Sequence, residues 1–438
     1  MNSMTREMKD SGIEWVGKIP VSWSIKKLNA FYSRKTIKNH PNERVLSVYR
    51  EYGVIPKDSR SDNHNVTSEN TSAYLLVQPT NLVVNKMKAW QGSMGISNHQ
   101  GIVSPAYFVY QETAVPRERR FFHYLLRSNI YAQEFRRLSR GMREGQWDLT
   151  AYDFERTPII VPPLLEQQQI ATFLDIKCSQ IDRLSDNIKQ QIEELGEYKK
   201  ALITQAITKG LDPDVEMKDS GIKWVGEIPS DWSISKLKYV ASIIGGNGFP
   251  EYLQGEDTDE IPFYKAGDIS AAVRKISDSR TYISRIIADK HRFNLIPSGA
   301  ILMPKIGEAM KKNSRALSTK ICCIDNNCQA IVPSNQVEQD YCYYLLCIVD
   351  MNDFDNAGTI PSLNNSKLLN LQIPFPPKKT QHAIANYLDS KCSQIDALIQ
   401  TKSEILNVLQ EYKKSLIFDY VTGKKEVPVS YRKDGCHE

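Results

Sequence analysis

The chain lacks long hydrophobic runs and is poor in cysteine. No apolar run reaches the roughly 20 residues that a membrane-spanning helix needs, and the opening MNSMTREMKDSG is too polar for a secretory signal. The 8 cysteines among 438 residues follow no regular framework, as is typical of free thiols in a reducing compartment. We therefore expect a soluble, cytoplasmic protein of two to four domains, without disulfides and without a membrane partner.

Motifs for catalysis and metal binding are also missing. The chain has no phosphate-binding loop, and the glycines of Gly245–Gly248 lack the third glycine of a dinucleotide fingerprint, so we expect a turn there. An enzyme that methylates a flipped base needs Asn or Asp before its Pro-Pro pair, but the prolines here occur in IVPPL and FPPKK. The clustered cysteines lack the paired C-x-x-C spacing of zinc sites, and KICCID predicts a buried strand. We expect no catalytic residue, no cofactor and no metal in this chain.

What the chain does have is a tandem duplication. Met8–Leu28 reappears at Met217–Leu237 with 16 identical positions out of 21, and Pro162–Leu184 is echoed by Pro376–Leu398. We call these repeated segments the frame. The first insert, 29–160, and the second insert, 238–373, lie between them and show no identity that can be aligned. One frame with two different inserts indicates one mechanical task performed on two different targets.

Each closing segment of the frame begins a long helix with a heptad pattern. From Glu166 to Lys209, Gly196 alone interrupts a stretch free of glycine and proline, and leucine or isoleucine recurs every seven residues from Leu174 to Leu202. The second helix keeps this register from Leu388 to Leu416, with Lys402 as an interruption. The pattern predicts a coiled coil between the two helices.

The order of the segments also predicts the topology. Antiparallel pairing returns the second helix to the N-terminal repeat, so each helix end meets one copy of DSGIxWVGxIP. The arrangement is circular, with a pseudo-two-fold axis. A helix of 44 residues spans about 65 Å at 1.5 Å per residue, which suits a spacer between two globular heads. DNA half-sites one helical turn apart need about 34 Å between their centres, which a spacer of this length can accommodate.

The charge is concentrated in the inserts. Between Arg117 and Glu144 there are eight arginines against three glutamates, and Lys305–Lys320 holds five cations against Glu308 alone. A solvated helix face explains the first stretch almost as well, since 116–138 is expected to be helical. Clustered cations that displace counterions from phosphates point instead to nucleic acid, and their presence in both inserts favours this interpretation.

The fold class that we predict is α/β in the mixed α+β sense, with two globular domains separated by two long antiparallel coiled-coil helices. Strands are expected at Tyr74–Val77, Leu82–Asn85, Tyr107–Tyr110 and Ala300–Met303. The predicted divisions are a first domain at 8–160, a first helix at 161–213, a second domain at 217–375, a second helix at 376–425 and a flexible tail at 426–438.

The frame and parts of the inserts resemble the specificity subunit of type I restriction-modification enzymes. The resemblance rests on DSGIxWVGxIPxxW, on the helix starts PPLLEQQQIATFLD and PPKKTQHAIANYLD, and on NKMKAWQGSMGIS, GIVSPAYFVY and AGTIPSLNNSKLLNLQIPFPP. It implies that each insert is a target recognition domain for one half of a bipartite, asymmetric DNA site, and that the helices set the gap. It further implies two methyltransferase subunits that bind S-adenosylmethionine and two motor-nuclease subunits that consume ATP with Mg²⁺. The second helix start departs from the pattern, with KKTQ for Leu-Glu-Gln, which leaves the fold intact and alters a local contact.

Candidate DNA-reading residues are cations, amides and aromatics near glycine-bracketed loops. They are Lys86, Lys88, Trp90, Gln91, Arg140, Arg143, Gln146 and Trp147 in the first insert, and Lys265, Lys305, Lys311, Lys312, Asn313 and Arg315 in the second. The four tryptophans of the frame, Trp15, Trp23, Trp224 and Trp232, are expected in the core.

Two other functions remain open at this point. One is a free-standing sequence-specific DNA-binding regulator, which tight operator binding by the isolated chain would reveal. The other is a catalytic DNA methyltransferase or nuclease with an unrecognised motif. Binding of S-adenosylmethionine by the isolated chain would distinguish it.

Overall fold

The protein consists of two compact units that both contain parts of the long helices. The computed structural model describes residues 6–50, 52–60, 67–141, 147–253, 260–356, 358 and 360–431. The first unit comprises Met1–Ile188 with Glu404–Glu438, and the second comprises Lys189–Ser403. Within the described ranges no helix combines the length and the apolar character needed to cross a membrane.

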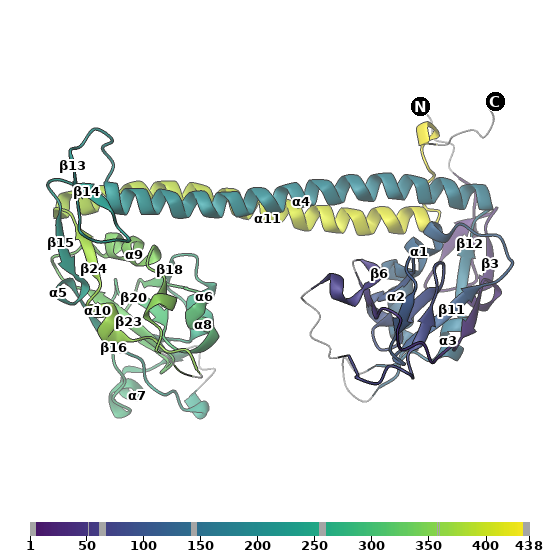
Figure 1. Cartoon of the computed structure of the whole chain (residues 1–438), viewed down its shortest axis with the longest axis horizontal. Coiled ribbons are helices and arrows are strands. Elements are labelled where there is room, and N and C mark those ends of the chain that lie inside the picture. Colours follow the sequence, from purple (N-terminus) through teal and green to yellow (C-terminus); the bar gives the residue numbers. More distant parts are fainter. Residues whose placement is uncertain are drawn as a thin grey trace. The chain divides into compact units, whose positions relative to one another are not determined.

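Two long helices were predicted, and both are present. They are α4 (Leu164–Lys209) and α11 (Lys378–Val421) (Figure 1). In the first unit, Lys413 Nζ lies 2.6 Å from Asp182 Oδ1. In the second unit, Lys199 Nζ lies 2.7 Å from Asp396 Oδ1. Residue numbers rise along α4 as they fall along α11, so the pairing is antiparallel in each unit, as the sequence predicted.

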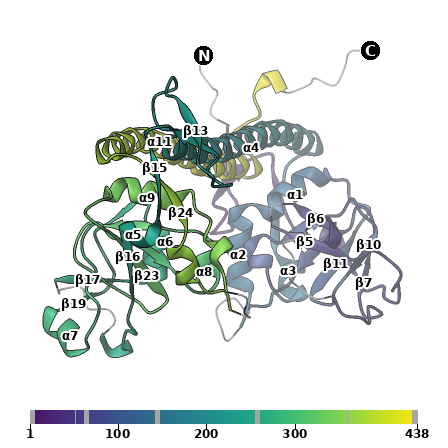
Figure 2. The same cartoon turned by 60° about the vertical axis from the view of Figure 1, so that its left-hand side comes forward.

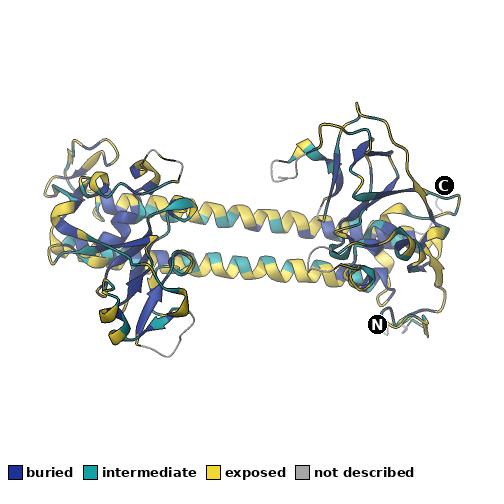
Figure 3. Ribbon diagram, turned by 90° about the horizontal axis from the view of Figure 1, so that it is seen from below, coloured by how far each residue is buried: buried dark blue, intermediate teal, exposed yellow. Residues whose placement is uncertain are grey.

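The helices meet along the predicted heptad seam. Leu174, Ile181 and Ile188 on α4 are buried, as are Leu388 and Leu416 on α11. Ile395 on α11 is buried as well. Leu195, Leu202, Lys402 and Leu409 are half-buried, while the outer faces of both helices are exposed (Figure 3). Lysines in the seam extend to polar partners on the opposite helix, which allows a cationic residue in a row of apolar ones.

Each long helix ends against one copy of the repeated N-terminal segment of the frame. Gly210 and Gly423 follow the helices with φ of +76° and +71°, the left-handed conformation that favours glycine at a helix C-terminus. A Cβ at Gly210 would lie 3.2 Å from the Trp232 ring, and a Cβ at Gly423 would lie 2.5 Å from Pro20 Cγ. The circular order that the sequence predicted is therefore confirmed.

The frame and the strand at the end of each insert form the same small sheets twice. The hairpins and two-stranded sheets are β1 (Met8–Asp10) with β2 (Lys18–Pro20), β3 (Ser24–Lys27) with β12 (Pro158–Val161), β13 (Met217–Asp219) with β14 (Glu227–Pro229), and β15 (Ser233–Lys236) with β24 (Gln372–Phe375). Trp23 and Trp232 are buried as predicted and Trp15 packs on Tyr131. The prediction for Trp224 was wrong, because its side chain is 39% exposed.

Each insert contains a mainly antiparallel sheet, and the first four strands of the two sheets follow the same order. The first sheet runs β4 (Tyr32–Lys35), β11 (Tyr107–Glu112), β8 (Leu82–Asn85) and β9 (Met94–Ile96). The second runs β16 (Ala241–Gly245), β23 (Cys328–Pro333), β20 (Ile301–Pro304), β21 (Ala316–Ser318) and β18 (Lys275–Ile276), the last pair being parallel. Figures 1 and 2 show these sheets in their separate units. The predicted mixed α+β class is confirmed.

The remaining elements surround these sheets. The other strands are β5 (Leu46–Tyr49), β6 (Gly53–Pro56), β7 (Leu75–Val77), β10 (Gly101–Val103), β17 (Ile261–Tyr264), β19 (Tyr282–Ile283) and β22 (Cys323–Ile324). The α-helices are α1 (Arg119–Arg127), α2 (Asn129–Leu138), α3 (Ala151–Arg156), α5 (Leu237–Val240), α6 (Ala266–Ala271), α7 (Arg285–Lys290), α8 (Gly307–Lys311), α9 (Gln339–Cys347) and α10 (Asn365–Leu369). Short 3₁₀ turns are η1 (Leu28–Ala30), η2 (Lys57–Ser59), η3 (Ala89–Gln91), η4 (Glu251–Leu253), η5 (Met351–Phe354) and η6 (Val429–Tyr431).

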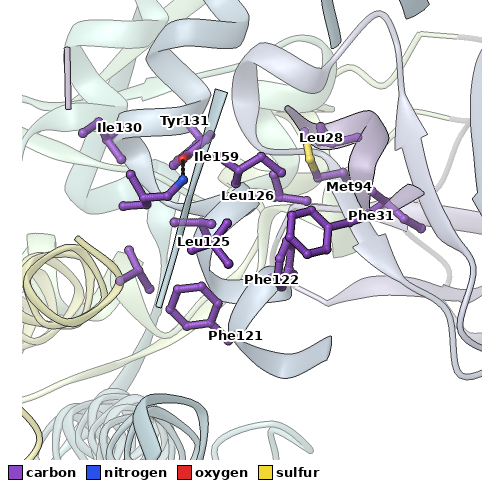
Figure 4. Packing of buried hydrophobic residues seen from close by; sticks show 14 of the residues in the cluster. Leu28, Phe31, Met94, Phe121, Phe122, Leu125, Leu126, Ile130, Tyr131 and Ile159 are labelled. Atoms are coloured by element: carbon purple, nitrogen blue, oxygen red, sulfur yellow. Dashed lines mark hydrogen bonds between the residues drawn. The ribbon is translucent and has the colours of Figure 1, made fainter. Parts of the chain in front are cut away.

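The helix predicted at 116–138 is two helices. Ser128 has the extended angles φ −62° and ψ 153°, so it ends α1 and precedes α2. The break lets Phe121 and Phe122 of α1 and Tyr131 of α2 enter one core (Figure 4). The Tyr131 hydroxyl accepts a hydrogen bond from the Ile160 N–H at 3.1 Å, which ties α2 to the strand that precedes α4.

The two inserts share a design that identity does not reveal. The α1 helix precedes α4 and contacts it as α9 contacts α11. Tyr124 donates to Asp175 Oδ1 at 2.8 Å, and Tyr344 donates to Asp389 Oδ1 at 2.8 Å. A glutamine of each long helix also accepts the backbone N–H that starts the insert helix, with Gln381 bonded to Glu338 at 2.8 Å. Frame and insert are therefore joined in the same way in both units.

Candidate nucleic-acid interface

Lys86 and Lys305 occupy equivalent positions in the two inserts. Lys86 directly follows β8, and its carbonyl accepts the Leu149 N–H at 3.0 Å. Lys305 directly follows β20, and its carbonyl accepts the Leu363 N–H at 2.9 Å. Each lysine N–H also donates to the residue just before the neighbouring strand, β11 or β23. The sequence nominated both lysines separately, and the structure places them at the start of one equivalent loop.

Two candidate segments of the first insert come together around a pair of tryptophans. The Trp90 and Trp147 rings lie 5.1 Å apart at 64°, and the Arg136 guanidinium lies 5.2 Å from the Trp147 ring centroid. The Trp90 indole donates to the Met87 carbonyl at 3.1 Å. Trp90 and Trp147 are half-buried. The Arg136 guanidinium thus makes a cation–π contact with the pair, and both rings stay partly exposed.

The cations beside this pair face solvent. Arg140 is exposed and forms an antiparallel bridge with Asp148, whose carboxylate lies 3.9 Å from Lys86 Nζ. Lys88 is exposed and Gln91 is half-buried in the same loop. Arg143 and Gln146 lie outside the described residues. The arrangement offers cations, an amide and aromatic edges from two adjacent segments, which is the chemistry that contacts phosphates and base edges.

Most other arginines of the first basic stretch have structural partners. Arg119 Nη2 lies 2.8 Å from Glu112, Arg120 Nη1 lies 2.8 Å from Asp175, and Arg137 Nη2 lies 2.7 Å from Glu134. Arg117 donates to two backbone carbonyls. The alternative interpretation of a paired helix surface therefore fits α1 and most of α2.

In the second insert the exposed candidates gather at α8. Lys312 is exposed, and Lys311 is exposed beside Glu308 at 2.8 Å, whose carboxylate raises the pKa of Lys311. Lys305 is half-buried at the start of the same loop. Lys265 precedes α6, where its N–H donates to Asp268 Oδ2 at 2.9 Å, and α6 packs against β20 and α8. Four of the six second-insert candidates therefore lie in one neighbourhood.

The other two candidates of the second insert, Arg315 and Asn313, make their contacts within the chain. Arg315 is 6% exposed, and its guanidinium donates to the carbonyls of Asn313 and Val349. Burial lowers the pKa of Arg315. Asn313 has φ +58°, and its side chain accepts the Met351 N–H at 3.0 Å. These hydrogen bonds hold the loop after α8 against the segment Val349–Met351. They also satisfy the polar groups of Arg315, as burial requires.

The segment AGTIPSLNNSKLLNLQIPFPP contributed to the family resemblance, but no DNA contact was predicted for the loop at its start, which follows the chain order of Arg140 to Asp148 in the first insert. Ile306 and Ser362 form an antiparallel bridge, and the Gly307 N–H donates to the Pro361 carbonyl at 2.8 Å. The loop is poor in charge, so a search for cations passed over it. Its place in the chain was the available signal, because it precedes the capping residue Asn364 as the first loop precedes the cap Thr150.

A family model and several known proteins are similar to this chain, and all of them concern type I restriction specificity. The family described as "Type I restriction modification DNA specificity domain" matches residues 31–194 and 229–411. The MjaVIII specificity subunit of a type I restriction enzyme of Methanocaldococcus jannaschii is 28% identical over 289 residues, which is 63% of this chain and 63% of that protein. The match thus spans less than two thirds of that relative's length.

Two further similarities cover nearly the whole chain. The EcoDI specificity subunit of a type I restriction enzyme of Escherichia coli is 21% identical over 427 residues, covering 92% of this chain and 88% of that one. A solved structure described as the basis of complex assembly and conformational transition of the type I R-M system has a TM-score of 0.68 at 15% identity. It covers 93% of this chain and 99% of that chain, so it shares the fold.

Proposed function

The chain belongs to the family of type I restriction modification DNA specificity domains, and on this premise we propose that it selects the DNA site for a multi-subunit restriction-modification complex in the cytoplasm. Each insert reads one half of a bipartite, asymmetric site, and α4 and α11 fix the unread gap between the halves. The chain itself performs no chemistry in this proposal.

One observation supports this proposal above the others. Two inserts without alignable identity present equivalent loops, which begin at Lys86 and Lys305, from the same place in equivalent sheets. Equivalent geometry serves a common task, namely approach to a DNA groove. Different side chains within the loops give different sequences in the two halves, because base edges are distinguished by the donors, acceptors and methyl groups that meet them.

The partners in this proposal are two methyltransferase subunits and two motor-nuclease subunits, beside double-stranded DNA. S-adenosylmethionine, ATP and Mg²⁺ belong to those partners. An outward face of α11 supports recruitment of a partner helix. There Ile405, Val408 and Tyr412 are all exposed at a spacing of three and four residues, which puts three large apolar side chains on one helix face.

The equivalent lysines give a matched pair of variants. We expect Lys86→Ala to weaken the contribution of one half-site and Lys305→Ala that of the other, each by about tenfold, with the salt dependence of binding reduced by roughly one phosphate contact. The measurement is binding of the complex with the methyltransferase subunit to DNA in which either half-site is scrambled.

Each lysine variant is the control for the other. Both lysines directly follow a four-residue strand, and both substitutions remove the same ammonium group. An equal loss by both variants on both half-scrambled DNAs would contradict the assignment of one insert to one half-site.

A further inference from the structure

Ile360 is an exposed apolar side chain in the loop for which no DNA-reading residue was predicted. Its side chain is 66% exposed. The polar groups beside it form the base of the loop. The Asn356 N–H donates to the Ser362 carbonyl at 2.8 Å, and the Asn364 amide donates to Asn356 Oδ1 at 2.9 Å. Asn356, Ser362 and Asn364 thus have partners within the chain, whereas most of the Ile360 side chain is exposed to solvent.

The loop is attached directly to the basic α8 region. Pro361 and Ser362, the two residues after Ile360, pair with Ile306 and Gly307, where α8 begins. The helix carries Lys311 and is followed by Lys312, both exposed. The loop of Ile360 and the helix of the cations are therefore joined by backbone pairing. The cations suit phosphates, and the isoleucine suits an apolar group of a base.

Resting on the proposed function, we propose that Ile360 determines specificity for the second half-site by packing against the C5 methyl group of a thymine in the major groove. Isoleucine neither donates nor accepts hydrogen bonds, and the thymine methyl is the apolar group that a base pair displays in that groove. In the first insert, the bridge between Arg140 and Asp148 lies at the equivalent point of the chain, just before the cap of the next helix.

The test compares thymine with deoxyuridine, which lacks only the methyl group. The full chain in complex with the methyltransferase subunit is bound to duplexes that carry its methylated motif, with each thymine of the second half-site replaced in turn. One replacement is expected to weaken binding about fourfold, the value of one buried carbon group. Ile360→Ala should weaken binding to the thymine duplex and abolish this thymine preference.

Ile286→Ala is the matched control, because Ile286 lies on α7 in the same insert and is 79% exposed. It should keep the full preference. The proposal is overturned if no thymine of the half-site shows a preference, if Ile360→Ala retains it, or if Ile360→Ala weakens all DNA equally as a nonspecific wedge would. Absence of any split methylated motif would instead overturn the proposed function, so the two failures are distinguishable.

Discussion

Replacement of Gly423 by alanine is expected to lower the free energy of unfolding of the first unit by about 3 kcal/mol. The φ of +71° at Gly423 costs an L-residue about 1 kcal/mol. The new Cβ would also lie 2.5 Å from Pro20 Cγ and 3.0 Å from the Trp23 ring, whereas carbon atoms pack at about 3.5 to 4 Å. The end of α11 must then move away from Pro20 and Trp23, which weakens the packing between this helix and the N-terminal repeat. Urea unfolding followed by tryptophan fluorescence gives the measurement.

The matched control is Gly12→Ala, which isolates the backbone cost. Gly12 has φ +69°, and nothing lies within 4 Å of the position of its Cβ. That variant should lose about 1 kcal/mol. Gly210→Ala in the second unit should fall between the two, because the closest contact there is 3.2 Å. Equal losses at Gly12 and Gly423 would show that the joint between α11 and the N-terminal repeat does not stabilise the unit.

Lengthening both long helices by one heptad is expected to change the gap in the recognised DNA and to leave both half-sites as they were. Seven residues added after Gln190 and seven after Lys402 keep the seam in register, since Lys402 Nζ bonds Gln191 Oε1 at 2.6 Å and marks the opposed positions. The addition lengthens each helix by about 10 Å, which corresponds to up to about three base pairs. The gap is measured from the methylated motif.

The control for this insertion replaces Gln191–Glu197 with the same heptad at constant length. That variant should recognise the original gap. An unchanged gap after the insertion, in a complex that still methylates DNA, would contradict the role of the helices as a spacer.

Much of the architecture was predictable because it is repeated or periodic. The similarity of Met8–Leu28 to Met217–Leu237 predicted the duplication, and the heptad pattern predicted the seam. The antiparallel pairing of the helices was predicted from the order of the segments. The contact of each helix end with one copy of the repeated N-terminal segment also followed from the order of the segments. The exchange of Glu166 for Thr380 also had the predicted local effect: Glu166 accepts the Trp23 indole N–H at 2.9 Å, and threonine supplies no carboxylate there.

The inserts were less predictable because their structure depends on contacts between distant segments. Pairing of Lys305–Gly307 with Pro361–Leu363 is invisible to local patterns, so the loop of Ile360 was not predicted to lie beside the basic residues of α8. Charge alone also gave no sign that the Arg315 guanidinium is buried and bonded to the Val349 carbonyl. A cation beside a strand of buried residues is as suited to hold a loop as to contact DNA.

The most direct test of the central claim is single-molecule sequencing of DNA from a methylation-free host that expresses this chain with its methyltransferase subunit, scored for modified adenines. The account predicts one split, asymmetric motif with an unspecified gap, and loss of that motif without this chain. A complex that assembles and yields no split motif, or a motif that persists without the chain, would contradict the claim that this protein selects the site.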